Sequence, residues 1–100
     1  MFHTIKNYIL SPEAESDLGD IFDYTQQQFG IDQAATYLSE LEENFMRLIA
    51  NPQLGRERNE ICEGLRSLTP SSHVIFYRTH DDHIRIIRIL HGSRDLPKLF

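Results

Sequence analysis

The sequence contains a single cysteine, Cys62, and no tryptophan. A lone cysteine can form neither an internal disulfide nor a clustered thiolate metal site, a pattern that a reducing compartment permits. No apolar run approaches the ~20 residues that a membrane-spanning helix requires, and Met1 to Leu10 lack the basic-then-apolar layout of a signal peptide. We therefore expect a cytoplasmic protein that does not enter a membrane.

Residues that interrupt regular structure are also scarce, with five glycines and four prolines in a chain of 100 residues. Hydrophobic residues make up 40% of the chain, which argues against a disordered protein. A chain of this length can bury one modest core but not two. We expect a single domain that spans residues 1–100.

Cations are scarce in the first half of the chain. Residues 1–50 contain two lysine or arginine residues and nine aspartate or glutamate residues, whereas residues 51–100 contain eight cations and six anions. Seven of those eight cations are arginine, which suits bidentate recognition of carboxylates or phosphates. An acidic or phosphate-bearing partner would therefore meet the second half of the chain.

The first half predicts a short strand and then a helix. Residues 5–10 alternate loosely and stop at Ser11 and Pro12, which suit the N-cap and the first position of a helix. An apolar stripe then recurs every three or four residues until Gly30 closes the helix. The members of this stripe are Ala14, Leu18, Ile21, Phe22, Thr25 and Phe29.

A second helix is expected after Gly30, with Asp32 as its N-cap and Asn51-Pro52 at its end. Two helices joined by one tight turn form an αα-hairpin. We expect the core to contain the stripes of both helices. The stripe of the second helix comprises Ala34, Leu38, Leu41, Phe45, Leu48 and Ile49.

The second half predicts a polar loop over residues 53–63 and then strands at 65–68, 73–79 and 84–90. Strict alternation in the last strand would place one set of residues over the helices and the other on the floor of a groove. These sets are Ile84, Ile86, Arg88 and Leu90, and Arg85, Ile87, Ile89 and His91. The order predicts an α+β fold of the type β-α-α-β-β-β, with an N-terminal strand, an αα-hairpin and a three-stranded antiparallel meander, helices packed on one face of the sheet.

Three histidines, His73, His80 and His83, lie near one predicted hairpin, but their spacing matches no metal-ligand pattern and no cysteine joins them. We therefore expect no metal and no cofactor. The chain also lacks a helix-turn-helix and a basic arm, so we expect no sequence-specific DNA binding of its own.

Four segments that follow one another along nearly the whole chain have a characteristic order and spacing. They are LSPEAESDLGDIFDYTQQQFG (10–30), NPQLGRERNEICEGLRSL (51–68), SHVIFYR (72–78) and IRIIRILHGSRD (84–95). Together they resemble the ParE branch of the RelE/ParE superfamily, the toxins of bacterial type II toxin–antitoxin modules. The resemblance implies the α+β toxin fold, a cognate ParD-like antitoxin that neutralises the toxin, and a toxin that is not an enzyme but poisons DNA gyrase.

The RelE branch of the same superfamily implies an alternative, ribosome-dependent cleavage of mRNA. That chemistry needs a base, an acid and cations that stabilise the charged phosphorane. The candidates here are Arg56, Arg58, Arg66, Arg88 and His91. Against this alternative, the chain has no tyrosine after Tyr77 to stack on a base, and its net charge of −5 disfavours entry into an RNA-rich site.

The resemblance also implies a surface for the antitoxin, which would offer an amphipathic helix and an extended acidic segment to a groove between the sheet and the helix edges. We expect its carboxylates to meet Arg66, Arg78, Arg88 and Arg94. For Arg66 and Arg88 an internal role is open, in which each pairs with a nearby carboxylate such as Glu60 or Glu63. A structural role is likewise open for His91.

The surface that contacts the target is not marked by a motif, and the residues to test are Lys98, Leu99 and Phe100. A third function belongs to another class, in which the chain has lost its toxicity and only assists its antitoxin in regulation. Expression without an antitoxin separates these functions, because a toxin that has lost its activity leaves growth unchanged.

Overall fold

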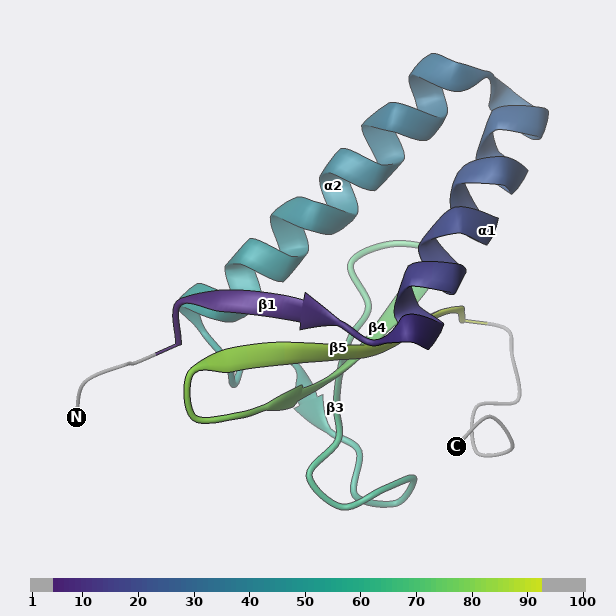
Figure 1. Cartoon of the computed structure of the whole chain (residues 1–100). Helices are drawn as coiled ribbons and strands as arrows, with labels where there is room; N and C mark the ends of the chain where they lie inside the picture. The colour runs from purple at the N-terminus through teal and green to yellow at the C-terminus, as the bar shows by residue number, and fades with distance from the viewer. Residues whose placement is uncertain (1–4, 93–100) are drawn as a thin grey trace.

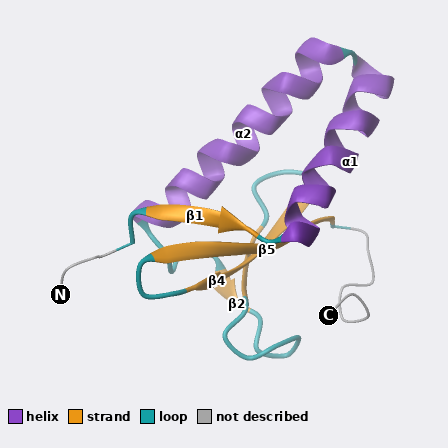
Figure 2. Ribbon diagram, viewed as in Figure 1, coloured by secondary structure: helices purple, strands orange, loops and turns teal. Residues whose placement is uncertain are grey.

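The computed structural model describes residues 5–92, which form a sheet with a helical hairpin on one face (Figure 1). The elements in chain order are β1 (Asn7–Leu10), α1 (Pro12–Phe29), α2 (Ile31–Ala50), β2 (Arg56–Glu57), β3 (Arg66–Leu68), β4 (His73–Thr79) and β5 (His83–His91). The predicted α+β fold is confirmed. The two helices lie side by side, and their connecting turn projects far from the sheet (Figure 2).

The sheet has five strands in the order β1-β5-β4-β3-β2, rather than a meander of three. The predicted meander corresponds to β3, β4 and β5, which pair antiparallel. The first strand joins the same sheet parallel to β5, with Tyr8 opposite Ile84. The additional strand β2 lies within the predicted loop and pairs with β3 through two residues, too few for any periodicity to be visible in the sequence.

Local signals define the helical hairpin. The Ser11 hydroxyl accepts a hydrogen bond from the Ala14 N–H at 3.0 Å, as expected of an N-cap. Gly30 ends α1 with a φ of 94°, a conformation that glycine adopts without strain. The same glycine is the N-cap of α2, so the prediction that Asp32 caps this helix is wrong, and Asp32 lies in the first turn instead.

The main core lies between the helices and the sheet, where Leu41, Phe45 and Leu48 of α2 pack against strand residues such as Tyr77. The predicted stripes are largely confirmed, but Phe29 is 69% exposed because it lies at the tip of the hairpin, beyond the sheet. None of the helices in residues 5–92 is long and apolar enough to cross a membrane.

The opposite face of the sheet carries a second, smaller core. Its buried residues, Leu65, Val74, Phe76 and Leu90, are partly covered by side chains from the loop before β3, including Ile61. The sequence predicted a groove floor on this face, and the loop before β3 instead covers part of it with apolar side chains.

A bulge in β5 changes which side chains share a face. Phe76 pairs with Arg88, but Tyr77 pairs with Ile86, so Ile87 is an extra residue in β5. Ile84 and Ile86 therefore lie on the helix side together with Ile89. The predicted strict alternation of β5 is wrong because it assumed an uninterrupted strand.

Candidate functional site

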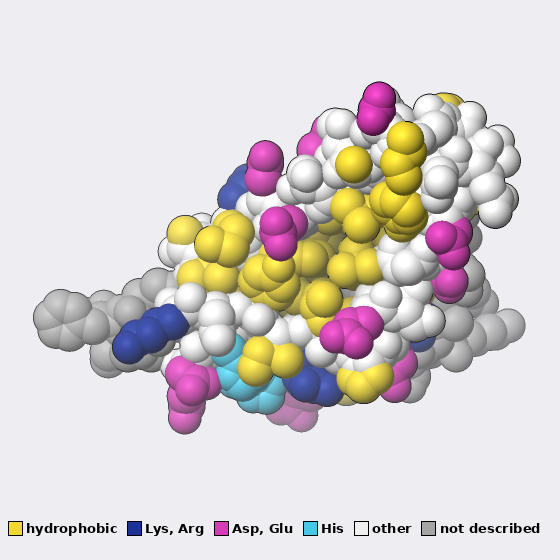
Figure 3. Space-filling model, turned by 45° about the horizontal axis from the view of Figure 1, so that its top comes forward, with side chains coloured by type: hydrophobic (Ala, Val, Ile, Leu, Met, Phe, Trp, Pro, Cys, Tyr) yellow, Lys and Arg dark blue, Asp and Glu magenta, His cyan; other side chains and the backbone are white. Residues whose placement is uncertain are grey.

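A hydrophobic hollow opens between the two helices and above β1. Figure 3 shows apolar side chains gathered in this hollow, with acidic side chains around it. The hollow has a volume of about 240 Å³ and is lined by Tyr8, Leu10, Leu18, Leu38, Ser39, Glu42 and Phe45. It exists because the apolar stripes of both helices are wider than the surface that the sheet covers.

Tyr8 gives this hollow its polar edge. Its hydroxyl donates a hydrogen bond to Glu42 Oε2 at 2.9 Å, and its ring lies 5.0 Å from that of Phe45. Partial burial and the neighbouring Glu42 carboxylate raise the pKa of Tyr8. The hollow therefore combines an apolar floor with an acidic rim, which suits an amphipathic helix.

The next feature is an ion pair that joins α1 to β5 just beyond the bulge. Arg88 donates from Nε and Nη2 to the two carboxylate oxygens of Asp17 at 2.8 and 2.9 Å. Asp17 also accepts the backbone N–H of Ile89 at 3.0 Å. The hydrogen bonds to Asp17 raise the pKa of Arg88. The guanidinium of Arg88 thus already has a carboxylate partner within the protein.

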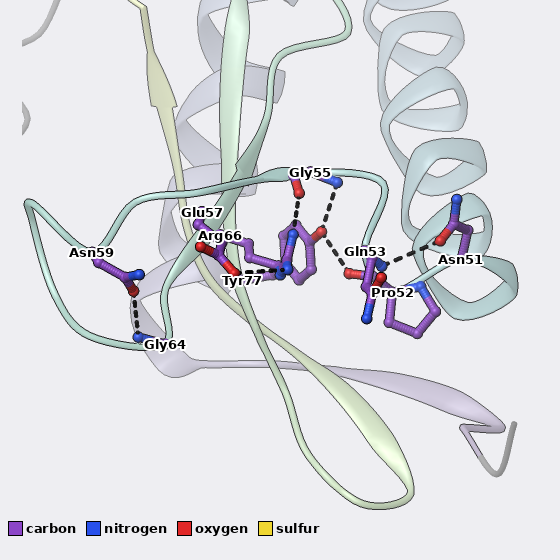
Figure 4. A network of polar contacts seen from close by, with 9 residues as sticks. All are labelled: Asn51, Pro52, Gln53, Gly55, Glu57, Asn59, Gly64, Arg66 and Tyr77. Atoms are coloured by element: carbon purple, nitrogen blue, oxygen red, sulfur yellow. Dashed lines mark hydrogen bonds and ion pairs between the residues drawn. The ribbon is translucent and has the colours of Figure 1, made fainter. Parts of the chain in front are cut away.

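A polar network around Tyr77 fixes the loop that joins α2 to β2 (Figure 4). The buried Tyr77 hydroxyl donates to the Pro52 carbonyl and accepts from the Gly55 N–H, both at 2.8 Å. Arg66 donates to the Gly55 carbonyl and lies 3.4 Å from the Glu57 carboxylate. Burial raises the pKa of Tyr77, which keeps the hydroxyl protonated as a donor.

Arginines gather on the face of the sheet that points away from the helices. Arg58 lies 5.7 Å from the centre of the Phe76 ring and forms an ion pair of 2.7 Å with Glu60. Arg78 donates to the Glu63 carbonyl at 2.6 Å. Arg85 lies directly opposite Arg78 in the antiparallel pairing, so two like charges stand side by side there.

A row of aromatic and imidazole rings crosses the end of the sheet. The Tyr37 hydroxyl lies 2.7 Å from His73 Nδ1, and the His73 ring is 5.5 Å from the His91 ring in an edge-on arrangement. Burial, with the neighbouring His91, lowers the pKa of His73. His73 is therefore predominantly neutral at neutral pH.

The residues proposed for a nuclease are not brought to one place. Arg66 lies on the helix side of the sheet, Arg58 lies on the opposite side, and Arg88 is held by Asp17. Arg56 is exposed on β2, and His91 belongs to the row of rings. Within residues 5–92 these five side chains do not form a site that combines a base, an acid and cations around one phosphate.

The internal role considered for Arg66 and Arg88 is present, although their partners are Glu57 and Asp17 rather than Glu60 or Glu63. Glu60 instead pairs with Arg58, and Glu63 offers its carbonyl to Arg78. The other site residues predicted from the sequence are Arg94, Lys98, Leu99 and Phe100, and they lie outside the described residues.

The histidines near the β4–β5 turn form a stacked pair, with the His80 and His83 rings 4.8 Å apart. His83 lies 2.8 Å from Asp82, which lowers the pKa of that exposed carboxylate through a hydrogen bond. Within residues 5–92, no three histidine, cysteine, aspartate or glutamate side chains are placed to hold a metal ion.

Sequence reasoning missed Asp17, the most buried carboxylate of α1. A signal was available, because Asp17 falls on the apolar stripe between Ala14 and Ile21, where a charge must find a partner. It also missed Tyr24 and Tyr37, which carry no periodic signal of their own and are brought to the same end of the sheet only by the fold.

Comparison with known proteins identifies relatives over most of the chain. The family model described as "ParE toxin of type II toxin-antitoxin system, parDE" matches residues 8–96. Toxin ParE1 of Mycobacterium tuberculosis is 42% identical over 92 residues, covering 91% of this chain and 94% of that protein. Toxin ParE1 of Caulobacter vibrioides is 38% identical over 89 residues, covering 89% and 92%.

A solved structure shows the same fold at lower sequence identity. A chain from the "Chromosomal ParDE TA system from P. aeruginosa" superposes with a TM-score of 0.76 and 23% identity, covering 90% of this chain and 98% of that chain.

Proposed function

Because the chain belongs to the ParE toxins of type II toxin–antitoxin systems, we propose that it binds DNA gyrase in the cytoplasm and traps the enzyme on cleaved DNA. The observation that carries this proposal is the match to the ParE toxin family over residues 8–96, which spans the described helices and strands apart from Asn7, the first residue of β1. The chain acts as a binding protein in this proposal and not as an enzyme.

The arrangement of the arginines supports gyrase binding over cleavage of mRNA. A nuclease must direct its cations at one phosphate in a preorganised site. Here Arg58, Arg66 and Arg88 lie in three different places, and each already has a partner within the protein. These ion pairs within the protein explain the positions of the three arginines without a bound substrate.

A cognate antitoxin, ParD-like in its chemistry, neutralises the toxin in this proposal. The apolar face of an antitoxin helix would lie in the hydrophobic hollow against Leu18 and Leu38. An extended acidic segment would follow the arginine face of the sheet, where Arg78 and Arg85 stand side by side. Arg66, Arg88 and Arg94 remain predicted antitoxin contacts, and the first two would have to exchange an internal partner for an external one.

A gyrase assay with purified, antitoxin-free protein tests the proposal. The assay follows loss of supercoiling and the appearance of linear plasmid after detergent and protease. We expect linear DNA in proportion to the amount of toxin, and its suppression when the antitoxin is added first. Topoisomerase I with the same plasmid is the control, since it should be unaffected.

Folding of the purified protein must be verified by circular dichroism before a negative result is interpreted. Folded protein that leaves gyrase active contradicts the proposal. Cleavage of a translated mRNA in the presence of ribosomes would then identify the RelE-type activity. Unchanged growth on expression without antitoxin would instead indicate a regulatory partner that is no longer toxic.

A further inference from the structure

A second cleft lies on the other side of α1 from the hydrophobic hollow. It consists of two adjoining parts of about 300 and 310 Å³ that share Tyr24, His73 and His91. Helix α1 lines it through residues spaced three or four apart, among them Asp17, Asp20 and Tyr24, whereas Leu18 of the same helix faces the hollow. An antitoxin helix in the hollow would therefore leave this cleft open.

Aromatic side chains dominate the cleft. Tyr24 is 63% exposed and Phe29 is 69% exposed, so α1 presents two large rings to solvent. The floor continues through Tyr37, His73 and His91, whose successive rings lie 5.5 Å apart. The rings of Tyr24, Phe29 and Tyr37 offer negative π faces to a cation within about 6 Å.

The charge of the cleft is negative. Among residues 5–92, no lysine or arginine lines either of its two parts, but Asp17 and Asp20 both line the first part. Helix α1 carries five carboxylates and no lysine or arginine. Asp17 is paired with Arg88, whereas no lysine or arginine of the described part of the chain lines the cleft to balance the charge of Asp20.

The imidazole of His73 does not oppose a cation at neutral pH, because burial lowers its pKa. Each of the two parts has a volume at the lower limit of the roughly 300–1,000 Å³ that ligand pockets have. The cleft is therefore suited to one or two side chains from a protein segment rather than to a large free ligand.

We propose that this cleft binds an arginine or lysine side chain presented by an exposed segment of the target protein, with the cation stacked on Tyr24 and paired with Asp20. Carboxylate and aromatic groups around one opening are the combination that recognises guanidinium and ammonium groups. The identity of the target rests on the proposed function, but the cation-binding chemistry does not.

A titration of the full chain followed by two-dimensional NMR tests the proposal. The probe is the peptide acetyl-Gly-Arg-Gly-Arg-Gly-amide, and the matched control has citrulline, a neutral isostere, in place of each arginine. We expect the arginine peptide to shift the amide signals of Tyr24, His73 and His91, and the citrulline peptide to bind more weakly. Raising the salt from about 0.05 M to about 0.5 M should weaken only the former.

Two variants assign the charge to its position. Asp20→Asn should weaken arginine-peptide binding about two- to fivefold, the effect of a partly exposed ion pair. Asp23→Asn removes the same charge from an exposed position of α1 that does not line the cleft, and should leave the affinity close to that of the parent. Tyr24→Leu should weaken binding without changing the net charge.

Equal binding of both peptides, or equal effects of Asp20→Asn and Asp23→Asn, would overturn the proposal. So would tighter peptide binding by the full-length double variant Arg94→Ala, Lys98→Ala, because the chain's own end would then be the occupant. The titration involves no gyrase. A chain that poisons gyrase but ignores the peptide thus refutes only the cleft, and the reverse outcome refutes only the gyrase proposal.

Discussion

At Gly55 the absence of a side chain allows the loop before β2 to approach Tyr77. A Cβ at this position would lie 2.6 Å from both the Tyr77 hydroxyl and the Ser67 carbonyl. Both neighbours are buried and fixed, so neither can move away cheaply. The backbone contact with Tyr77 therefore requires glycine for reasons of space, not of backbone conformation.

We predict that Gly55→Ala lowers the free energy of unfolding by about 1–3 kcal/mol, the usual effect of overpacking. The matched control is Gly19→Ala in the middle of α1, where a Cβ would meet nothing within 4 Å. Gly19→Ala should raise the free energy of unfolding by about 0.5–1 kcal/mol, because alanine has a higher helix propensity than glycine. Urea unfolding measures the stability of both variants. Equal changes in the free energy of unfolding for Gly55→Ala and Gly19→Ala would contradict this account of Gly55.

His73 predicts how stability depends on pH. Burial lowers its pKa in the folded protein below the value in the unfolded chain. The unfolded state therefore binds more protons as the pH falls below that unfolded value of about 6.5, and stability decreases in the same direction. Stability contributed by neutral His73 is present above this pH and is lost below it.

We expect the urea midpoint to be lower at about pH 5.5 than at about pH 7.5, with a smaller difference in His73→Gln. The control is His80→Gln, since His80 is exposed in the β4–β5 turn. A pH dependence that His73→Gln leaves unaltered would assign the effect to another group.

Among the elements, the helices were predictable because their signals are local. Ser11, the apolar stripe and Gly30 lie within one stretch of chain, and together they specify where α1 begins and ends. The bulge at Ile87 and the strand β2 were not predictable, because each depends on pairing with residues distant in sequence. The same reason hid the cleft, whose lining comes from α1, α2, β4 and β5.

The ion pair between Asp17 and Arg88 holds α1 on β5. We expect the loss of Asp17 to destabilise the protein more than the loss of Arg88. Asp17→Ala removes the partner of Arg88 and also the acceptor of the Ile89 N–H, so we expect a loss of about 2–4 kcal/mol. Arg88→Ala leaves the hydrogen bond from Ile89 intact and should cost less. Thermal or urea unfolding measures both variants.

A double-mutant cycle with both substitutions isolates the coupling between the two side chains. Asp23→Ala, at an exposed position of the same helix, is the control for a lost carboxylate and should change stability by no more than about 0.5 kcal/mol. Equal losses for Asp17→Ala and Arg88→Ala would show that the hydrogen bond to Ile89 contributes nothing.

On the scale of the whole molecule, acidic and basic side chains are unevenly distributed over the two sides of the sheet. The helical hairpin carries most of the acidic side chains and the hydrophobic hollow, whereas Arg58, Arg78 and Arg85 lie on the face of the sheet that points away from the helices. A partner that covers both must wrap around the protein, and an antitoxin with a helix and an extended segment has a suitable form.

We predict that Leu38→Glu in the hollow weakens antitoxin binding about tenfold or more, because a carboxylate replaces an apolar contact. The control is Ala35→Glu, which adds the same charge at an exposed position of α2 outside the hollow. Isothermal titration calorimetry gives both affinities, after melting curves show that both variants are folded. Comparable weakening by both variants would place the antitoxin elsewhere.

The parallel pairing of β1 with β5 also has a consequence for synthesis in the cell. Asn7 and Tyr8 find their partners only at His83 and Ile84, so the first strand has no place in the sheet until almost all of the chain has been translated. Contacts of such long sequence separation form slowly. The complete sheet therefore forms only after β5 has left the ribosome, and any binding surface that depends on the sheet forms after that point.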